Sequence, residues 1–254
     1  MNLTSAWLEA IDGTNALNAT IEFSRFGDRR TVDVADARRV AFEDADPMRQ
    51  FVSWPGKKNF EGKLWMSTIR QHVAFESFWE RSFLMMLDRT GETVGVASQP
   101  MRIRWRVPKA ENRREYLEHF PDYFARRRDG SALLVDVRPQ ELVKPDDQVK
   151  FDLTRRMASA LGWSYLVFDD LPGATQENLR FLLRYRDPAW LEGLQMSAIP
   201  KGRSMPLAAL ANFLDVQARS GWGAAYALVW SGVAHVDLSR PLSPMTPVSI
   251  GGES

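Results

Sequence analysis

Apolar and polar residues alternate along several short segments of the N-terminal half, and a period of two is typical of half-buried β-strands. Ala19–Phe23 and Thr31–Val34 are two such segments, separated by a Gly-Asp turn. A third segment, Met101–Val107, alternates apolar residues with arginines, so its arginines are predicted to share one face. These arginines are Arg102, Arg104 and Arg106.

Apolar residues three or four positions apart predict two amphipathic helices. The first covers His72–Asp88, and the second covers Asp146–Leu161, where Gly162 is expected to end it. The run Trp163–Phe168 that follows is mostly apolar and is predicted to be a buried strand. The residues expected on the buried face of the second helix are Val149, Leu153, Met157 and Ala160.

The pattern of a β-hairpin lies between these two helices. Phe120–Ala125 is predicted to form one strand and Leu133–Arg138 the other, joined by an Arg-Asp-Gly turn. Asp136 and Arg138 are two residues apart, so they share a face of their strand. We expect the hairpin to bring Asp122 close to Asp136, where a divalent cation would offset the repulsion between two like charges.

The C-terminal third of the chain changes character. Thr175–Tyr185 and Pro206–Arg219 are predicted helices. Ala224–Trp230 and Val233–Leu238, joined by Ser-Gly, are predicted to form a β-hairpin. The tail from Ser239 is rich in Pro, Ser and Gly and is expected to be extended or loose.

The order of these elements predicts an α/β protein with a mixed sheet flanked by helices. We expect an N-terminal, partly β segment over 1–60, the α/β domain over 61–172, and a small helical, winged-helix-like module with its loose tail over 173–254. The basic, aromatic stretch Trp54–Phe60 is expected to be a connector, with a DNA contact as the alternative. A chain of 254 residues with 44% apolar content is long enough for one large core or two small ones.

Charge is balanced overall, at +1, but not locally. Nine Arg or Lys residues lie between Arg102 and Arg128 against four acids, which leaves the segment at +5. Such a bias favours a phosphate-rich partner such as DNA, with a solvated surface as the alternative. The candidate DNA contacts are Arg126 and Arg127, together with Arg102, Arg104 and Arg106.

Several function classes are excluded by residues that the sequence lacks. There is no cysteine, so disulfides, thiolate zinc sites and cysteine nucleophiles are ruled out. The three histidines have no metal-ligand spacing, and no glycine-rich phosphate loop occurs. With no basic, apolar leader and no long apolar run, we expect a soluble protein of the cytoplasm that does not enter membranes.

The acidic residues point to one chemistry. Glu80 lies in the first predicted helix, Asp122 follows a proline, and Asp136 precedes Arg138 by two positions. Mg²⁺ requires several hard oxygen ligands around one point, and phosphodiester hydrolysis requires a metal-activated water. We therefore predict that these three acids bind Mg²⁺ and that Arg138 acts beside them. Glu76, four residues before Glu80, is a candidate additional ligand, with a surface ion pair as the alternative reading of either glutamate.

The motifs around these acids resemble TnsA-like endonuclease subunits of heteromeric (Tns-type) transposases, which belong to the PD-(D/E)xK nuclease superfamily. The resemblance covers roughly residues 54–170. It is carried by Ser77-Phe78-Trp79-Glu80-Arg81, Ser98-Gln99-Pro100, His119-Phe120-Pro121-Asp122-Tyr123 and Leu134-Val135-Asp136-Val137-Arg138-Pro139.

The resemblance implies a restriction-endonuclease-like core and a nuclease that uses Mg²⁺, with Mn²⁺ as a substitute, to cut one strand at the 5′ ends of a transposon. It implies three partners: the transposon-end DNA, a DDE-type transposase (TnsB-like) and an AAA+ regulator (TnsC-like). By this resemblance Glu80 is the helical acid, Asp122 the central metal ligand and Asp136 the second strand acid. Gln99 would position water or DNA.

Arg138 stands where such nucleases usually carry a catalytic lysine, and three explanations stay open. Arg138 itself stabilises charge on the phosphate, since arginine stays protonated; Lys144 or Lys150 reaches in from another position; or the site is inactive. Two other functions accordingly remain: a stand-alone restriction or repair nuclease with the same core, and a catalytically inactive DNA-binding scaffold subunit.

Overall fold

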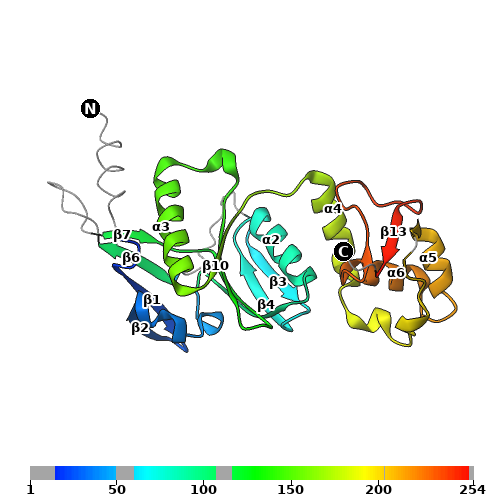
Figure 1. Ribbon diagram of the computed structural model, residues 1–254, viewed down its shortest axis with the longest axis horizontal. Coiled ribbons are helices and arrows are strands. Elements are labelled where there is room, and N and C mark those ends of the chain that lie inside the picture. The colour runs from blue at the N-terminus through cyan, green and yellow to red at the C-terminus, as the bar shows by residue number, and fades with distance from the viewer. Residues whose placement is uncertain (1–14, 50–59, 107–115, 203, 252–254) are drawn as a thin grey trace. The chain divides into compact units, whose positions relative to one another are not determined.

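The computed structural model describes residues 15–49, 60–106, 116–202 and 204–251, and it has a mixed α/β fold (Figure 1). The chain divides into two compact units. Unit 1 holds the chain up to Leu64 together with 72–80 and 92–170, and unit 2 holds 65–71, 81–91 and the chain from Leu171 onward. The break after Asp170 lies close to the predicted boundary at 172. Most of the predicted connector 54–60 lies outside the described residues.

The first sheet of unit 1 has four antiparallel strands in the order β2-β1-β6-β7. The strands predicted around 19–23, 31–34 and 101–107 are confirmed within it. The fourth strand, β7, was not predicted. The bounds are β1 Ala19–Arg25, β2 Asp28–Asp33, β6 Arg102–Arg106 and β7 Tyr116–His119, and two 3₁₀ turns follow β2 at Val34–Arg39 and Phe42–Asp44.

The second sheet of unit 1 carries the predicted hairpin and has the order β10-β9-β8-β5. Strand β8 (Tyr123–Arg127) pairs antiparallel with β9 (Ala132–Val137) and with β5 (Thr93–Ser98), while β10 (Ser164–Phe168) runs parallel to β9. The hairpin turn contains Gly130 at a φ of 83°, a conformation that suits glycine. The hairpin and the strand after Trp163 are therefore confirmed. Strand β10 is only partly buried, because it lies at the edge of the sheet.

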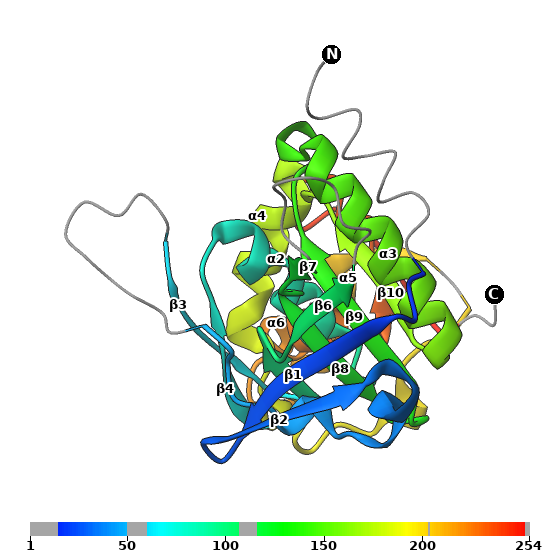
Figure 2. The same ribbon diagram turned by 90° about the vertical axis from the view of Figure 1, so that its left-hand side faces the viewer.

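Helix α3 (Pro145–Leu161) connects β9 to β10 and lies along this sheet (Figure 2). A 3₁₀ turn at Gln140–Leu142 precedes it. The helix begins with a capping interaction in which the Asp147 carboxylate accepts a hydrogen bond from the Lys144 backbone N–H at 3.1 Å. Gly162 ends it at a φ of 72°, as predicted. One prediction for its buried face is wrong, because Ala160 is exposed while Ala158 and Leu161 are buried.

One hydrophobic core joins the N-terminal strands to the second sheet and α3. Phe42, from the turn after β2, packs against Phe124 of β8 and against Trp163, with ring centroids 5.6 and 5.7 Å away. Ile21 of β1 and Leu153 of α3 belong to the same buried cluster. The described part of the segment predicted over 1–60 therefore shares its core with the rest of unit 1.

The first predicted helix starts later than expected. Residues 71–75 form strand β4 (Gln71–Phe75), which pairs with β3 (Gly62–Met66), and helix α2 covers only Phe78–Arg89. The helix begins after Ser77 because the Ser77 hydroxyl accepts the Glu80 backbone N–H at 3.1 Å, which caps the first turn. Val73 and Phe75 are buried and alternate with more exposed residues along β4.

Unit 2 contains the C-terminal helices and a small sheet with the order β11-β13-β12. Both predicted helices are confirmed, although their bounds differ from the predicted ones. The elements are α4 Gly173–Leu182, α5 Leu207–Leu214, α6 Gly221–Trp230, β11 Met205–Pro206, β12 Ala234–His235 and β13 Pro247–Ile250, with 3₁₀ turns at Leu183–Tyr185, Pro188–Leu191 and Met196–Ala198.

Two C-terminal predictions are wrong. The hairpin predicted over 224–238 does not form, because 221–230 is helix α6, which is capped by Ser220 and buried on nearly all sides. The tail is not loose throughout, since Val248 and Ile250 of β13 are buried.

Helices α5 and α6 approach closely: a Cβ at Gly221 would lie 2.1 Å from the Ala211 carbonyl oxygen. Within the described ranges, no helix has the length and apolar character needed to cross a bilayer.

Candidate active site

The predicted acids line one cleft of about 650 Å³ in unit 1. Glu80 enters it from the first turn of α2, Asp122 from the residue before β8, and Asp136 from β9. The three acids therefore lie on the same side of the sheet. The cleft is also lined by Glu76, His119, Arg138, Asp147 and Lys150.

The carboxylate of Glu80 is held by three donors. One oxygen accepts the Glu76 backbone N–H at 2.8 Å and the Tyr123 hydroxyl at 3.1 Å, and the other accepts the Ser77 hydroxyl at 3.0 Å. Burial raises the pKa of Glu80 above its ordinary value, while these hydrogen bonds act in the opposite direction. Glu80 therefore caps its own helix and also presents a carboxylate to the cleft.

Asp122 is placed by the hairpin. Tyr123 pairs with Val135, so the register carried one step further sets Asp122 opposite Asp136. One carboxylate oxygen of Asp122 accepts the Val137 backbone N–H at 2.7 Å. Burial raises the pKa of Asp122 well above its usual range, and the negative charges of Asp136 and Glu80 raise it further. A partly buried carboxylate surrounded by like charge favours either a proton or a cation.

Asp136 is 3% exposed and anchored by two side chains that sequence reasoning did not assign to the site. Its Oδ2 atom lies 2.9 Å from Nε2 of His119 and accepts a hydrogen bond from the Tyr165 hydroxyl of β10. The histidine ring packs between Trp105 and Phe151. Burial and the charge of Asp136 raise the pKa of Tyr165, which keeps this hydroxyl protonated as a donor. The sequence does not indicate that Tyr165 is a partner of Asp136, because the contact depends on the pairing of β10 with β9.

Three cationic side chains line the cleft, Arg49, Arg138 and Lys150, and the last two have different surroundings. The guanidinium of Arg138 is tied to the start of α3: its Nε donates to the Leu142 carbonyl oxygen at 3.2 Å, and its Nη2 lies 3.4 Å from Asp147. Lys150 lies on the same helix one turn beyond Asp147 and also lines the cleft. Lys144 precedes the helix and is exposed.

The predicted supporting residues Glu76 and Gln99 lie next to each other. Glu76 precedes α2, so the helical spacing that was expected to align it with Glu80 does not apply, although it still lines the cleft. The Gln99 side chain donates to Glu76 at 3.2 Å, and the Gln99 backbone N–H donates to the Asp122 carbonyl oxygen at 2.6 Å. Within the described residues, the buried Oε1 atom of Gln99 has no hydrogen-bond partner.

The acids of the cleft have the donor chemistry that Mg²⁺ requires. Carboxylate oxygens are the hard ligands that this ion prefers. Burial, and then the negative charges of Asp136 and Glu80, raise the pKa of Asp122, and a divalent cation would lower the cost of ionising it. As the described side chains stand, no group of three or more His, Asp or Glu residues is already arranged around a metal position.

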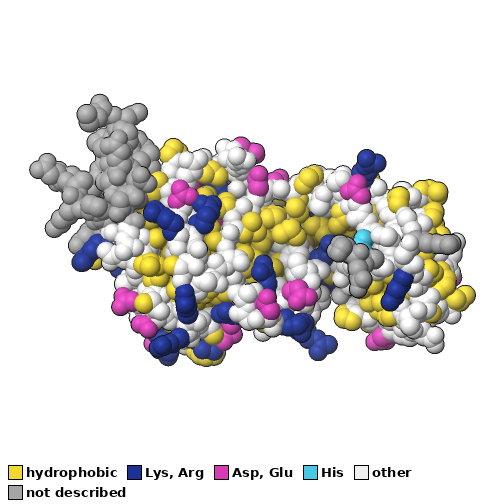
Figure 3. Space-filling model, viewed as in Figure 1, with side chains coloured by type: hydrophobic (Ala, Val, Ile, Leu, Met, Phe, Trp, Pro, Cys, Tyr) yellow, Lys and Arg dark blue, Asp and Glu magenta, His cyan; other side chains and the backbone are white. Residues whose placement is uncertain are grey.

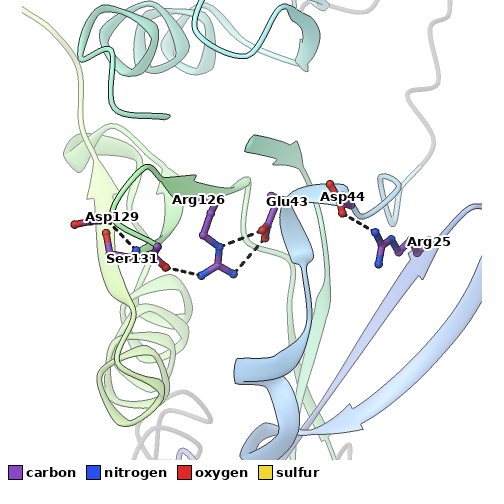
Figure 4. Close-up of polar contacts among 7 residues, drawn as sticks. Arg25, Glu43, Asp44, Arg126, Asp129 and Ser131 are labelled. Atoms are coloured by element: carbon purple, nitrogen blue, oxygen red, sulfur yellow. Dashed lines mark hydrogen bonds and ion pairs between the residues drawn. The ribbon is translucent and has the colours of Figure 1, made fainter. Parts of the chain in front are cut away.

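Most of the arginines predicted to contact DNA are paired with acids. Arg102 pairs with Glu22, and Arg104 lies 3.0 Å from Glu118. Arg126 makes a two-pronged ion pair with Glu43, at 3.1 and 3.2 Å (Figure 4). Arg106 is exposed and Arg127 is partly exposed. On the face shown in Figure 3, Lys and Arg side chains are interspersed with acids rather than gathered in one patch.

No model of a known protein family matches the sequence, and no curated protein matches it. The function is therefore inferred from the cleft and from the motifs that line it.

Proposed function

We propose that this chain is the metal-dependent DNA endonuclease subunit of a heteromeric transposase, which cuts one strand at the 5′ ends of the transposon. The observation that supports this proposal is the convergence of Glu80, Asp122 and Asp136 on one cleft. These residues come from a helix, a strand entry and a neighbouring strand, the order expected for the PD-(D/E)xK nuclease core. The proposal includes that core for unit 1 and a winged-helix-like module for unit 2.

The electrostatics of the cleft support a divalent cation there. Two of the acids lie in or next to a buried hairpin, and the pKa of Asp122 is raised by both of the others. Ionising all three without a counterion would place like charges together at low dielectric, which is costly. Mg²⁺, or Mn²⁺ in its place, would offset this repulsion, and the ligands would be Glu80, Asp122 and Asp136.

The remaining residues have distinct tasks in this proposal. A bound Mg²⁺ supplies an acidified water and a Lewis acid next to the scissile phosphate. The hydrogen bond from the Val137 N–H orients Asp122, and Tyr165 orients Asp136. Lys150 and Arg138 offer positive charge to the phosphate in the transition state. Of the two, Lys150 is the stronger candidate, because Asp147 and a backbone carbonyl already engage Arg138.

The partners follow from the resemblance of the motifs. The DNA substrate is the transposon end, a DDE-type transposase (TnsB-like) makes the second-strand cuts, and an AAA+ regulator (TnsC-like) controls the assembly. Because acids neutralise Arg102, Arg104 and Arg126, recognition of the end sequence is assigned mainly to the partner transposase.

A nicking assay on supercoiled DNA that carries transposon ends, with the partner transposase and Mg²⁺, tests the proposal. Asp122→Asn keeps an acceptor for the Val137 N–H but removes one ligand, so we expect cleavage to fall at least about 100-fold. Asp129→Asn is the matched control, because Asp129 lies exposed in the hairpin turn, and its cleavage should equal wild type. Unchanged cleavage by Asp122→Asn would remove this residue from the mechanism.

The same assay separates the alternatives. A restriction-type nuclease would cut without the transposase, and an inactive scaffold would show no Mg²⁺-dependent cutting under any condition. Lys150→Gln should slow cleavage while Lys144→Gln, on the exposed residue before α3, should not. If these two lysine variants are equally active, Arg138 rather than Lys150 stabilises the charge on the phosphate.

A further inference from the structure

Unit 2 carries two neighbouring pockets that are lined by arginines. One pocket of about 360 Å³ includes Arg70, Arg184 and Arg186, and the other, of about 390 Å³, includes Arg81, Arg180 and Arg184. Arg184 belongs to both, so the pockets adjoin. All five side chains lie within the same compact unit. We call them the arginine surface: Arg70, Arg81, Arg180, Arg184 and Arg186.

The centre of this surface is built by α4 and the 3₁₀ turn that continues it. Leu179 and Leu182 point into the core, and this leaves Arg180 and Arg184 on the exposed side. These two arginines are four residues apart, about 6 Å along the helix axis, so their guanidinium groups project from one face. The Arg184 guanidinium also lies 5.1 Å from the ring centroid of Phe181, which limits where it points.

The acidic side chains that line these two pockets do not neutralise the charge of the arginine surface. Five arginines line the two pockets against two acids, Glu177 and Asp187. The Asp187 carboxylate accepts the Ala189 backbone N–H at 2.9 Å, where it caps a 3₁₀ turn. Within the described parts of the chain, none of the five arginines forms an ion pair.

Two further observations show a site suited to an anion. Arg81 and Arg180 line the same pocket, and burial together with the positive charge of Arg180 lowers the pKa of Arg81. Arg70, Arg184 and Arg186 line the neighbouring pocket together. A guanidinium fork fits phosphate oxygens.

We propose that the arginine surface binds the phosphodiester backbone of DNA. Acids already engage Arg102, Arg104 and Arg126, whereas the charge of the arginine surface remains for a partner. The site lies in unit 2, whereas the acidic cleft belongs to unit 1. Binding requires neither a metal ion nor cleavage, so this inference does not depend on the proposed nuclease activity.

Fluorescence anisotropy with the full chain, a labelled DNA duplex and EDTA tests the inference over a series of salt concentrations. Each phosphate contact contributes about 0.9 to the slope of log affinity against log salt. Arg180→Gln combined with Arg184→Gln should therefore lower the magnitude of the slope by about 1.8. Between about 50 and 200 mM salt, the wild type should then lose about tenfold more affinity than this double variant does.

The matched control is Arg29→Gln combined with Arg30→Gln, which removes the same charge from residues that are 70% and 60% exposed in unit 1. Its slope should equal that of the wild type. Thermal melting checks the fold of each variant. If the Arg180/Arg184 variant melts early, Arg180→Gln alone, at an exposed position, should still lower the slope by about 0.9.

Wild-type slope and affinity in the Arg180/Arg184 variant would overturn the proposal. ATP is titrated in parallel as a source of free phosphate groups. If ATP binds the wild type but not this variant while duplex binding is unchanged, the arginine surface is a nucleotide site and the DNA proposal is wrong. If duplex affinity and slope fall as stated and the control variant is unaffected, the proposal holds.

Discussion

Replacing Asp122 by asparagine should stabilise the metal-free protein while it removes the metal site. The pKa of Asp122 is raised by burial and by the charges of Asp136 and Glu80, so the folded protein binds this proton more tightly than the unfolded chain does. The stabilising contribution of the protonated form is complete below the unfolded pKa, about 3.9, and is lost as pH rises through the folded value. An asparagine side chain mimics the neutral form at every pH.

The contacts of Asp122 set the size of two effects that oppose this stabilisation, the loss of a hydrogen bond and the loss of metal binding. In Asp122→Asn the side-chain carbonyl would still accept the Val137 N–H, which lies 2.7 Å from the native carboxylate, so no hydrogen bond is lost. Asp122→Ala, in contrast, leaves that partly buried N–H without its acceptor and should cost about 1 kcal/mol. Metal binding stabilises the wild type by about 2.7 kcal/mol when the ion is at about 100 times its Kd. That free energy corresponds to a rise of about 5–10 °C in the melting temperature of a chain of this size.

Thermal melting with EDTA or with Mg²⁺, at a series of pH values, measures both effects. In EDTA, Asp122→Asn should melt above the wild type, by a margin that grows as pH rises above the unfolded pKa of about 3.9. With Mg²⁺ the wild type should rise and the variant should not. A variant that melts below the wild type at about pH 8 in EDTA, or that gains as much from Mg²⁺, would refute the electrostatic reasoning.

Three further predictions follow from contacts in and around the cleft. Tyr165→Phe removes the hydroxyl that donates to Asp136 and should weaken metal affinity about 10–100-fold in calorimetric titration; unchanged affinity would show that Asp136 is oriented without it. Glu43→Gln takes the carboxylate from Arg126, which is 20% exposed, and should lower the free energy of unfolding by about 1–3 kcal/mol in urea, without changing DNA affinity. Gly221→Ala sets a methyl group against a backbone oxygen at 2.1 Å and should cost about 1–3 kcal/mol, whereas wild-type stability would mean that α5 and α6 separate freely.

The elements that could be predicted from sequence are those with a clear period and a clear end. The hairpin of β8 and β9 has a period of two and a glycine turn, and α3 has a period near 3.6 with Gly162 after it. Helix α6 was mistaken for a strand because it is buried nearly all round, so its sequence shows no amphipathic period. The start of α2 was misplaced because the cap at Ser77 outweighs the apolar spacing before it.

The acids of the candidate site could be named in advance, but their partners could not. The motifs around Glu80, Asp122 and Asp136 were enough to predict that these three acids line one cleft. Tyr165 reaches Asp136 only because β10 lies parallel to β9, and such an alignment has no local signal in the sequence. The pairing of Arg126 with Glu43 likewise joins residues 83 positions apart, so an excess of arginines in one segment is not sufficient to predict a free basic surface.

The most direct test of the account is the position of a bound metal. Anomalous scattering from crystals of the full chain grown with Mn²⁺ shows where the ion lies. We predict a peak in the cleft of unit 1, coordinated by carboxylate oxygens of Glu80, Asp122 and Asp136, and its loss in Asp122→Asn crystals. If the peak lies elsewhere, or if no peak appears at a Mn²⁺ concentration that supports cleavage, these three acids do not form the metal site.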